Sequence, residues 1–263
     1  MKVVPVPILD DNYAYLLIDE RDSTTAVVDP AEPEKVLAAA TKEGVQISKV
    51  LTTHKHSDHA GGNTTLKHLV PHLEVVGGSE ERVQACTTGV SDGECFAVGS
   101  ISVTCLHTPG HTMGHICYYV TDGDERAVFT GDMLFIGGAG RFFEGSATDV
   151  FPSLYEKLGK LPPDTLVYCG HEYTLANYRF ALSIEPDNKE LKRANQLATG
   201  QASYEGLADC PDHDIKGIFH KPFHARGPGL SAGPDRIRTW SDSSTTLATD
   251  SRHEKQFPRL SCM

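Results

Sequence analysis

The stretch that decides the fold runs from Thr53 to Asn63 and reads Thr-His-Lys-His-Ser-Asp-His-Ala-Gly-Gly-Asn. Within it stand four side chains that bind divalent metals through imidazole nitrogen or carboxylate oxygen: His54, His56, Asp58 and His59. A lone histidine in a polar loop is usually solvated or hydrogen-bonded to its neighbours. Four metal-binding side chains at this spacing instead favour a metal site.

The flanking residues predict where this stretch lies. An apolar, strand-like run ends at Leu51, and Gly61 and Gly62 let the backbone turn tightly into a helix. The donors therefore lie on a strand-to-helix loop. There the first two histidines can point one way while Asp58 and His59 point another, which suits two neighbouring cations better than one.

Length and composition indicate a soluble globular protein. The chain has 263 residues, 39% of them apolar, enough for one large domain or a core domain with a smaller appendage. No apolar run approaches the about 20 residues that a membrane helix needs. The sequence enters a strand pattern at Lys2 without a charged leader or an apolar signal core, so we expect a cytoplasmic protein.

Net charge limits the classes of binding partner, and cysteine content limits the kinds of cross-link and metal site. A formal net charge of -11 argues against nucleic acid or an anionic membrane as a partner. The seven cysteines are scattered and contain no Cys-x-x-Cys pair, which indicates reduced thiols rather than disulfides or a thiolate metal site. We expect a monomer that acts on a small molecule.

Hydrophobic periodicity predicts two blocks of strands. In the first block we expect strands over 2–8, 13–18, 24–29, 47–53 and 73–76, and helices over 33–43, over 63–69 and from about Ser79. In the second we expect an antiparallel set over 96–98, 101–106, 116–120 and 127–129, a strand over 166–169, and helices over 148–158, 175–182 and 188–198. Such blocks indicate two sheets packed face to face with helices outside.

Three later segments each place a metal donor beside glycine after an apolar strand. They are 108–115 with His111, 130–132 with Asp132, and 169–172 with His171. Each alone is more typical of a helix cap or a hydrogen-bonded loop residue. Together with the first four they make seven donors, the number that two metals sharing a bridging carboxylate would use.

The donor loop with these followers resembles the metallo-β-lactamase superfamily. Four further motifs resemble the hydroxyacylglutathione hydrolase (glyoxalase II) family or a close paralogue, and they lie at 1–3, 11–13, 140–145 and 161–165. The resemblance covers about residues 1 to 195. It implies a mixed α/β protein, with an αβ/βα four-layer sandwich over 1–172 and a C-terminal helical, substrate-binding region over 173–263.

The resemblance also implies an activity, a cofactor and a set of roles. The activity is hydrolysis of S-D-lactoylglutathione to glutathione and D-lactate, a step of methylglyoxal detoxification, with two Zn and/or Fe ions per chain. One metal would be held by His54, His56 and His111, the other by Asp58, His59 and His171, and Asp132 would bridge them. The glutathione site would be lined by Arg141, Phe143, His171 and Tyr173.

For the mechanism we hypothesise that a metal-bridging hydroxide, oriented by Asp58, attacks the thioester carbonyl and expels the thiolate. Asp29 and His115 are candidate supports for the ligands, because ligating imidazoles usually donate their other N–H to a neighbouring acceptor. Lys55 and Ser57 stand between ligands, and we expect both positions to tolerate substitution.

Several alternatives remain open. A serine or cysteine hydrolase is disfavoured, since the chain has no Gly-x-Ser-x-Gly elbow and neither Cys117 nor Cys169 lies in a nucleophile signature. A mononuclear iron persulfide dioxygenase on the same scaffold would leave the three donors Asp58, His59 and His171 without a metal. A metal-binding but catalytically impaired paralogue that has lost its glutathione site is the third alternative.

The tail departs from the family. After Ala198 the resemblance fades, and Gly200 to Met263 contains no valine. Codons for 208–213 and 219–227, read one base later, permit the family runs Pro-Thr-Val-Pro and Ser-Thr-Asn-Pro-Phe-Met-Arg-Val. We therefore interpret about 200–263 as an out-of-frame translation that packs poorly. On this interpretation Arg252 and Lys255 match the family's basic glutathione-binding residues only by accident.

Overall fold

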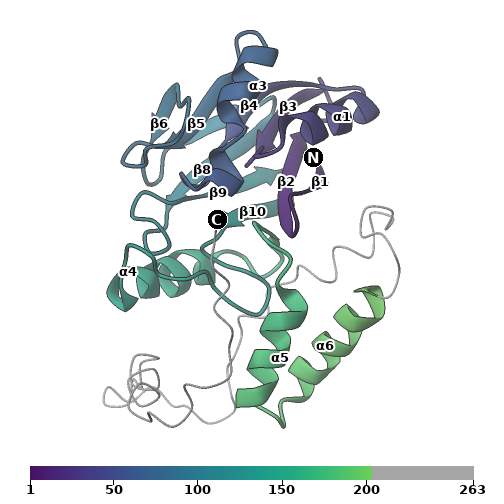
Figure 1. The fold of residues 1–263 in the computed structure, drawn as a ribbon, viewed down its shortest axis with the longest axis vertical. Helices are drawn as coiled ribbons and strands as arrows, with labels where there is room; N and C mark the ends of the chain where they lie inside the picture. The colour runs from purple at the N-terminus through teal and green to yellow at the C-terminus, as the bar shows by residue number, and fades with distance from the viewer. Residues whose placement is uncertain (203–263) are drawn as a thin grey trace, which may run out of the picture. The chain divides into compact units, whose positions relative to one another are not determined.

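Short runs of β-branched and apolar residues form strands that pair into two mixed sheets (Figure 1). The computed structural model describes residues 1–202, which belong to one compact unit. The expectations for the tail beyond Ala202, including Arg252 and Lys255, lie outside the described residues. The boundary between 172 and 173 stays a prediction.

The first sheet has six strands in sequence order. They are β1 (Lys2–Ile8), β2 (Asn12–Ile18), β3 (Thr24–Val28), β4 (Gln46–Leu51), β5 (Glu74–Gly78) and β6 (Thr88–Val90). The first three pair antiparallel, and β3 to β6 pair parallel. The parallel connections carry α1 (Pro33–Glu43), α2 (Ser57–Ala60) and α3 (Asn63–Leu69).

The second sheet has five strands in the order β11-β10-β9-β8-β7. They are β7 (Cys95–Val98), β8 (Ile101–His107), β9 (Ile116–Asp122), β10 (Glu125–Gly131) and β11 (Leu166–Cys169). The first four pair antiparallel, and β11 pairs parallel with β10. The helices of this half are α4 (Ala147–Phe151), a π-helix (Pro152–Lys157), a 3-10 helix (Leu158–Lys160), α5 (Thr174–Ile184) and α6 (Lys189–Ala202).

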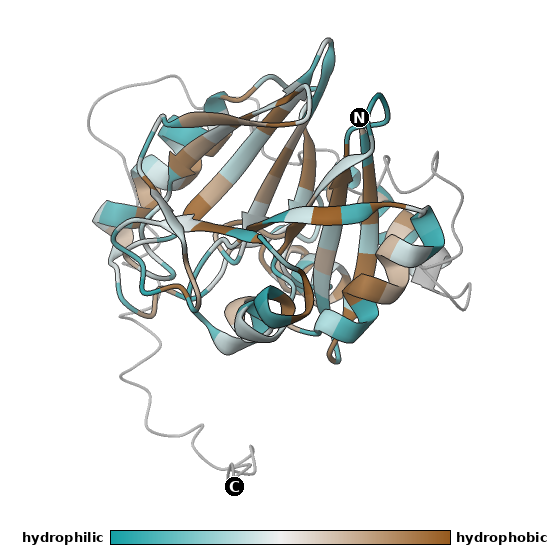
Figure 2. Ribbon diagram, turned by 90° about the horizontal axis from the view of Figure 1, so that it is seen from above, coloured by the Kyte–Doolittle hydropathy of each residue, from teal (hydrophilic) through white to brown (hydrophobic). Residues whose placement is uncertain are grey.

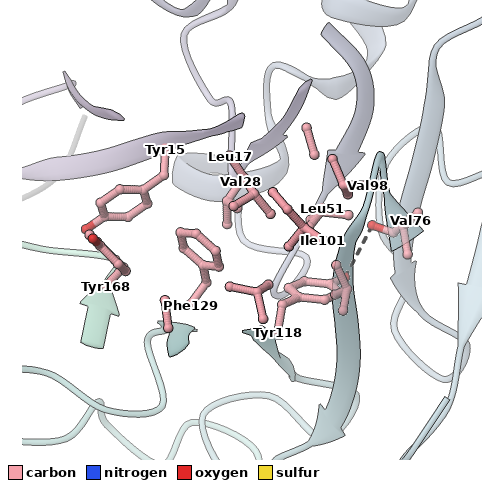
Figure 3. Packing of buried hydrophobic residues seen from close by; sticks show 14 of the residues in the cluster. Tyr15, Leu17, Val28, Leu51, Val76, Val98, Ile101, Tyr118, Phe129 and Tyr168 are labelled. Atoms are coloured by element: carbon pink, nitrogen blue, oxygen red, sulfur yellow. Dashed lines mark hydrogen bonds between the residues drawn. The ribbon is translucent and has the colours of Figure 1, made fainter. Parts of the chain in front are cut away.

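Three apolar clusters hold the layers together. The central one lies between the sheets and includes Tyr15, Tyr118 and Phe129 (Figure 3). A second packs α1 and α3 against the first sheet, and a third packs the later helices against the second sheet. Figure 2 shows that the strands carry both hydrophobic and hydrophilic residues. The predicted four-layer αβ/βα sandwich is thereby confirmed.

One edge of the sheets carries direct backbone bonds between them. The amide of Ile116 donates to the carbonyl of Thr53 at 2.9 Å, and that of Tyr13 donates to Gly170 at 2.9 Å. The loops that leave the strands at this edge are those with the predicted metal donors. Their positions are therefore fixed by main-chain pairing as well as by side-chain packing.

The structure corrects two predictions of secondary structure. No helix begins near Ser79; residues 79–87 form turns, with Ala85 at a φ of 57°. The side chain of Glu81 turns inward there and accepts two backbone N–H bonds, an arrangement that a surface helix would not allow. The helix predicted over 148–158 is divided into α4, the π-helix and the 3-10 helix. The structure also adds β6 and α2, which the sequence does not predict, so Asp58 and His59 lie on a short helix and not on the predicted loop.

The hydroxyl of Tyr118 provides a test of the contact between the sheets. It is fully buried and donates to the carbonyl of Thr52 at 2.8 Å, directly before the donor loop. Tyr118→Phe removes a buried hydrogen bond, so we expect unfolding free energy to fall by about 1–2 kcal/mol in urea titrations. Tyr119→Phe, a partly buried tyrosine on the same strand, is the control. An equal effect of both substitutions would contradict this account.

Candidate metal centre

All seven predicted donors meet at the edge where the two sheets are bonded. His54 to His59 follow β4, His111 lies in the β8–β9 loop, Asp132 follows β10 and His171 follows β11. The donors form three overlapping groups whose ligand atoms lie within 4.8 Å of one another. These are His54, His56 and His111; His54, His59 and Asp132; and Asp58, His59 and His171.

The first group consists of imidazoles only. His54 Nε2 and His111 Nε2 each lie 2.9 Å from His56 Nδ1. Because His111 Nδ1 donates to the carbonyl of Arg141 at 2.9 Å, Nε2 of its neutral ring keeps a lone pair directed inward. Burial lowers the pKa of His54 well below its usual value, and burial also lowers the pKa of His111. These two rings are neutral at physiological pH, the state in which histidine binds metals.

The group of Asp58, His59 and His171 mixes carboxylate and imidazole. Asp58 Oδ2 lies 3.4 Å from both His59 Nε2 and His171 Nε2. The side-chain amide of Asn12 donates to the same carboxylate oxygen at 3.1 Å. Hydrogen bonds from His171 and His59 hold the pKa of Asp58 well below its usual value, so this carboxylate is ionised.

Asp132 lies between the group of His54, His56 and His111 and the group of Asp58, His59 and His171. Its Oδ1 is 3.2 Å from His59 Nε2, and its Oδ2 is 3.4 Å from both His111 Nε2 and His171 Nε2. One carboxylate therefore faces ligands of both groups. This is the position that a bridging ligand would occupy.

Groups around the donors orient the imidazoles. His59 Nδ1 donates to Asp29 at 3.0 Å, and His171 Nδ1 donates to Asp11 at 2.9 Å, since an ionised carboxylate only accepts. Thr53 donates its hydroxyl to Asp29 at 2.7 Å and so accepts from His54 Nδ1 at 3.0 Å. Each of these three rings thus has one nitrogen held by the protein and the other directed into the site, as is usual for metal-binding histidines.

The acidic half of the site favours positive charge. Burial alone would lower the pKa of His59, but the carboxylates of Asp132, Asp29 and Asp58 raise it well above its usual value. Burial also opposes protonation of His171, yet Asp132 and Asp58 raise its pKa to about 10. Without a metal ion, protons on these rings supply the cationic charge that the carboxylates favour.

The residues fit a bound metal. Among the described residues, His59 Nε2 and Asp132 Oδ1 are buried side-chain atoms without a hydrogen bond of good geometry. A bound ion is one explanation for unpartnered buried polar atoms, and here they lie within the donor groups. Gly170 leaves the required space, since a Cβ there would lie 2.5 Å from Asp132 Oδ1 and 2.7 Å from His59 Cε1.

The residues expected to line the substrate site surround this cluster. The Phe143 ring stands edge-on to His56 and His111, with centroids 5.7 and 5.1 Å away, and it is 62% exposed. The Tyr173 ring stacks on His171 at 4.8 Å. Arg141 is exposed beside them, and its carbonyl holds His111. Their contacts with substrate stay a prediction.

Sequence reasoning missed several supporting residues. Asp11 was read as part of a family motif, but its place behind His171 depends on contacts 160 residues apart. The ammonium of Lys55 pairs with Glu144 at 2.6 Å, and the tolerance of this position to substitution stays a prediction. His115, which the sequence predicts as a support, stacks on His54 with ring centroids 5.1 Å apart, and its Nδ1 pairs with Thr108.

Comparison with known proteins agrees with this geometry. The metallo-beta-lactamase superfamily pattern matches residues 9–171. The cytoplasmic hydroxyacylglutathione hydrolase of Arabidopsis thaliana is 52% identical over 214 residues, which is 80% of this chain and 81% of that protein. This chain belongs to the metallo-β-lactamase superfamily and, within it, to the hydroxyacylglutathione hydrolase family. The predicted family is confirmed.

Solved structures of similar proteins share this fold. ETHE1 from Myxococcus xanthus has a TM-score of 0.59 and 32% identity, covering 66% of this chain and 76% of that protein. The protein TTHA1623, solved in a di-iron-bound form, has a TM-score of 0.54 and 29% identity, covering 65% and 92%. No helix among residues 1–202 has the length and apolar character of a membrane span.

The support of His171 gives a direct test of the metal centre. Asp11→Asn removes the anionic acceptor behind His171, so we expect affinity for the more weakly held zinc to fall by about 10- to 100-fold in chelator competition titrations. Asp10→Asn, at the exposed neighbouring position, should leave the affinity unchanged. Equal affinities in both variants would show that Asp11 does not support a ligand.

Proposed function

We propose that this chain is a binuclear metal-dependent thioester hydrolase that converts S-(2-hydroxyacyl)glutathione, with S-D-lactoylglutathione as the leading substrate, to glutathione and the 2-hydroxy acid. One observation carries the proposal. Two three-residue donor groups share Asp132 between them, in a chain that is 52% identical to a hydroxyacylglutathione hydrolase.

The ligand sets support two metal ions per chain. His54, His56 and His111 would hold one, Asp58, His59 and His171 the other, and Asp132 would contact both. Imidazole and carboxylate suit both zinc and iron, and one similar structure is named as a di-iron form. When bound, such a pair supplies an activated water and polarises a carbonyl group.

Asp58 is the candidate catalytic residue. Its side chain is 38% exposed whereas that of Asp132 is 9% exposed, so Asp58 is the carboxylate open to an incoming substrate. Asn12 fixes one of its oxygens, which leaves the other to orient a water molecule. The thiol product has a pKa near 8.5, so its thiolate leaves without a strong general acid.

Substrate binding would use the residues that surround the metal ligands. Glutathione carries carboxylates, and the protein has a formal net charge of -11, so a local cation is needed for binding. The exposed guanidinium of Arg141 offers two parallel donors for a carboxylate. Phe143 and Tyr173 offer ring faces to the apolar parts of the thioester. We further propose that the protein is a monomer. We also propose a cytoplasmic location, since one relative is named as cytoplasmic.

A mononuclear iron dioxygenase is the second candidate within the scaffold. It would need only one of the donor groups, yet Asp58, His59 and His171 lie within ligand distance of one another and are oriented by Asn12, Asp29 and Asp11. This supports a second occupied site and therefore the hydrolase.

Metal removal tests the chemistry. We expect close to two zinc or iron ions per chain by inductively coupled plasma mass spectrometry, and loss of lactoylglutathione hydrolysis to background after exhaustive chelation. Re-addition of zinc or iron should restore turnover. One metal per chain would favour the dioxygenase, and activity that survives chelation would revive a serine or cysteine nucleophile.

A second comparison separates chemistry from recognition. Arg141→Met removes the guanidinium but keeps the carbonyl that holds His111, so we expect KM for lactoylglutathione to rise about tenfold. Turnover of a small thioester without a glutathione group should be unchanged. Inactivity of the parent chain toward lactoylglutathione alone, with the small thioester still hydrolysed, would indicate the impaired paralogue.

A further inference from the structure

The segment 140–145 contacts the imidazoles of His56 and His111, and we refer to it as the mouth segment. It is attached near both ends, because the Arg141 carbonyl accepts from His111 and the Gly145 amide donates to Gly110 at 2.9 Å. Between these attachments Phe142 and Phe143 are 47% and 62% exposed. Apolar contacts alone therefore do not fix the middle of the segment.

Glu144 supplies the missing attachment. Its Oε1 pairs with the Lys55 ammonium at 2.6 Å, and its Oε2 accepts from the Met113 amide at 2.8 Å. Lys55 lies between two ligands of the β4–α2 loop, and Met113 lies in the β8–β9 loop. One carboxylate thus joins the mouth segment to the two loops that carry the imidazole group His54, His56 and His111.

The starting point of the Lys55 side chain is itself fixed. The Lys55 amide donates to Glu81 Oε1 at 2.9 Å, and the Gly114 amide donates to Glu81 Oε2 at 3.0 Å. Glu81 is only 6% exposed, so this contact is buried. Because one carboxylate fixes the backbone of Lys55, less conformational entropy is lost when its ammonium pairs with Glu144.

We propose that Lys55 and Glu144 form a positioning pair that holds the mouth segment over the metal centre and so places Phe143 and Arg141 for the thioester. The inference rests on the proposed function. Neither residue contacts the reacting atoms. The pair lowers the entropic cost of ordering the segment when substrate binds. Loss of the pair therefore raises KM and leaves kcat unchanged.

The test uses Glu144→Gln and Lys55→Met in the full chain. We expect each to raise KM for lactoylglutathione about three- to fivefold, with kcat within twofold and metal content unchanged. The double variant should resemble the single ones, because both remove the same contact. Lys55→Arg keeps the pair and should retain the parent KM.

Glu43→Gln is the matched control. It removes the ion pair of Lys2 with Glu43, which has the same N–O distance of 2.6 Å. The Glu43 side chain is 21% exposed, and the pair joins β1 to α1. A general loss of stability would change KM in this variant too. An equal rise in KM for both substitutions would overturn the inference, as would additive effects of Lys55→Met and Glu144→Gln.

Hydrogen exchange provides a measurement that does not depend on turnover. Amides of 142–145 should exchange faster in Glu144→Gln than in the parent, whereas those of β4 should not. Unchanged exchange would overturn the inference. If the parent chain failed to hydrolyse glutathione thioesters, the proposed function would be wrong, and the exchange rates would still decide whether the pair holds the segment.

Discussion

The structure depends on one constraint, the convergence of lone pairs in a site that is largely closed to water. Five imidazole nitrogens and two carboxylates are directed at one another over distances of 2.9 to 3.4 Å. Such an arrangement is unfavourable unless cationic charge lies among the donors. Ordinary packing would turn these side chains toward solvent or toward hydrogen-bond donors, so the surrounding fold must hold them in place.

The fold does so by making the site a junction between the two sheets. Asp11, in the turn after β1, supports His171 after β11, and the carbonyl of Thr53 accepts from Ile116 at the start of β9. Asp29 holds both Thr53 and His59 from a φ of 48°, a strained value for a residue other than glycine. Ligand geometry and the pairing of the sheets are therefore coupled, and a change at either affects both.

The donors could be predicted from the sequence because each stands in a local pattern. His54 to His59 follow an apolar strand, and His111, Asp132 and His171 each lie next to or near a glycine. Glu81 could not be predicted, because a charged residue after Gly-Gly-Ser is typical of a helix start, and only the fold reveals that its carboxylate is buried between two loops. The pairing of Lys55 with Glu144 spans 89 positions, and no local pattern connects them.

The residues proposed for substrate recognition and those proposed for catalysis lie in different parts of the structure. Every donor and every support of a ligand lies within residues 11 to 171, mostly at strand ends that the core fixes. The mouth segment is a loop held by a few polar contacts. Two divalent cations would offset the charges of Asp58, Asp132, Asp29 and Asp11, and so would remove most of the local negative field in an acidic protein. Metal loading would then favour the binding of an anionic thioester as well as its cleavage.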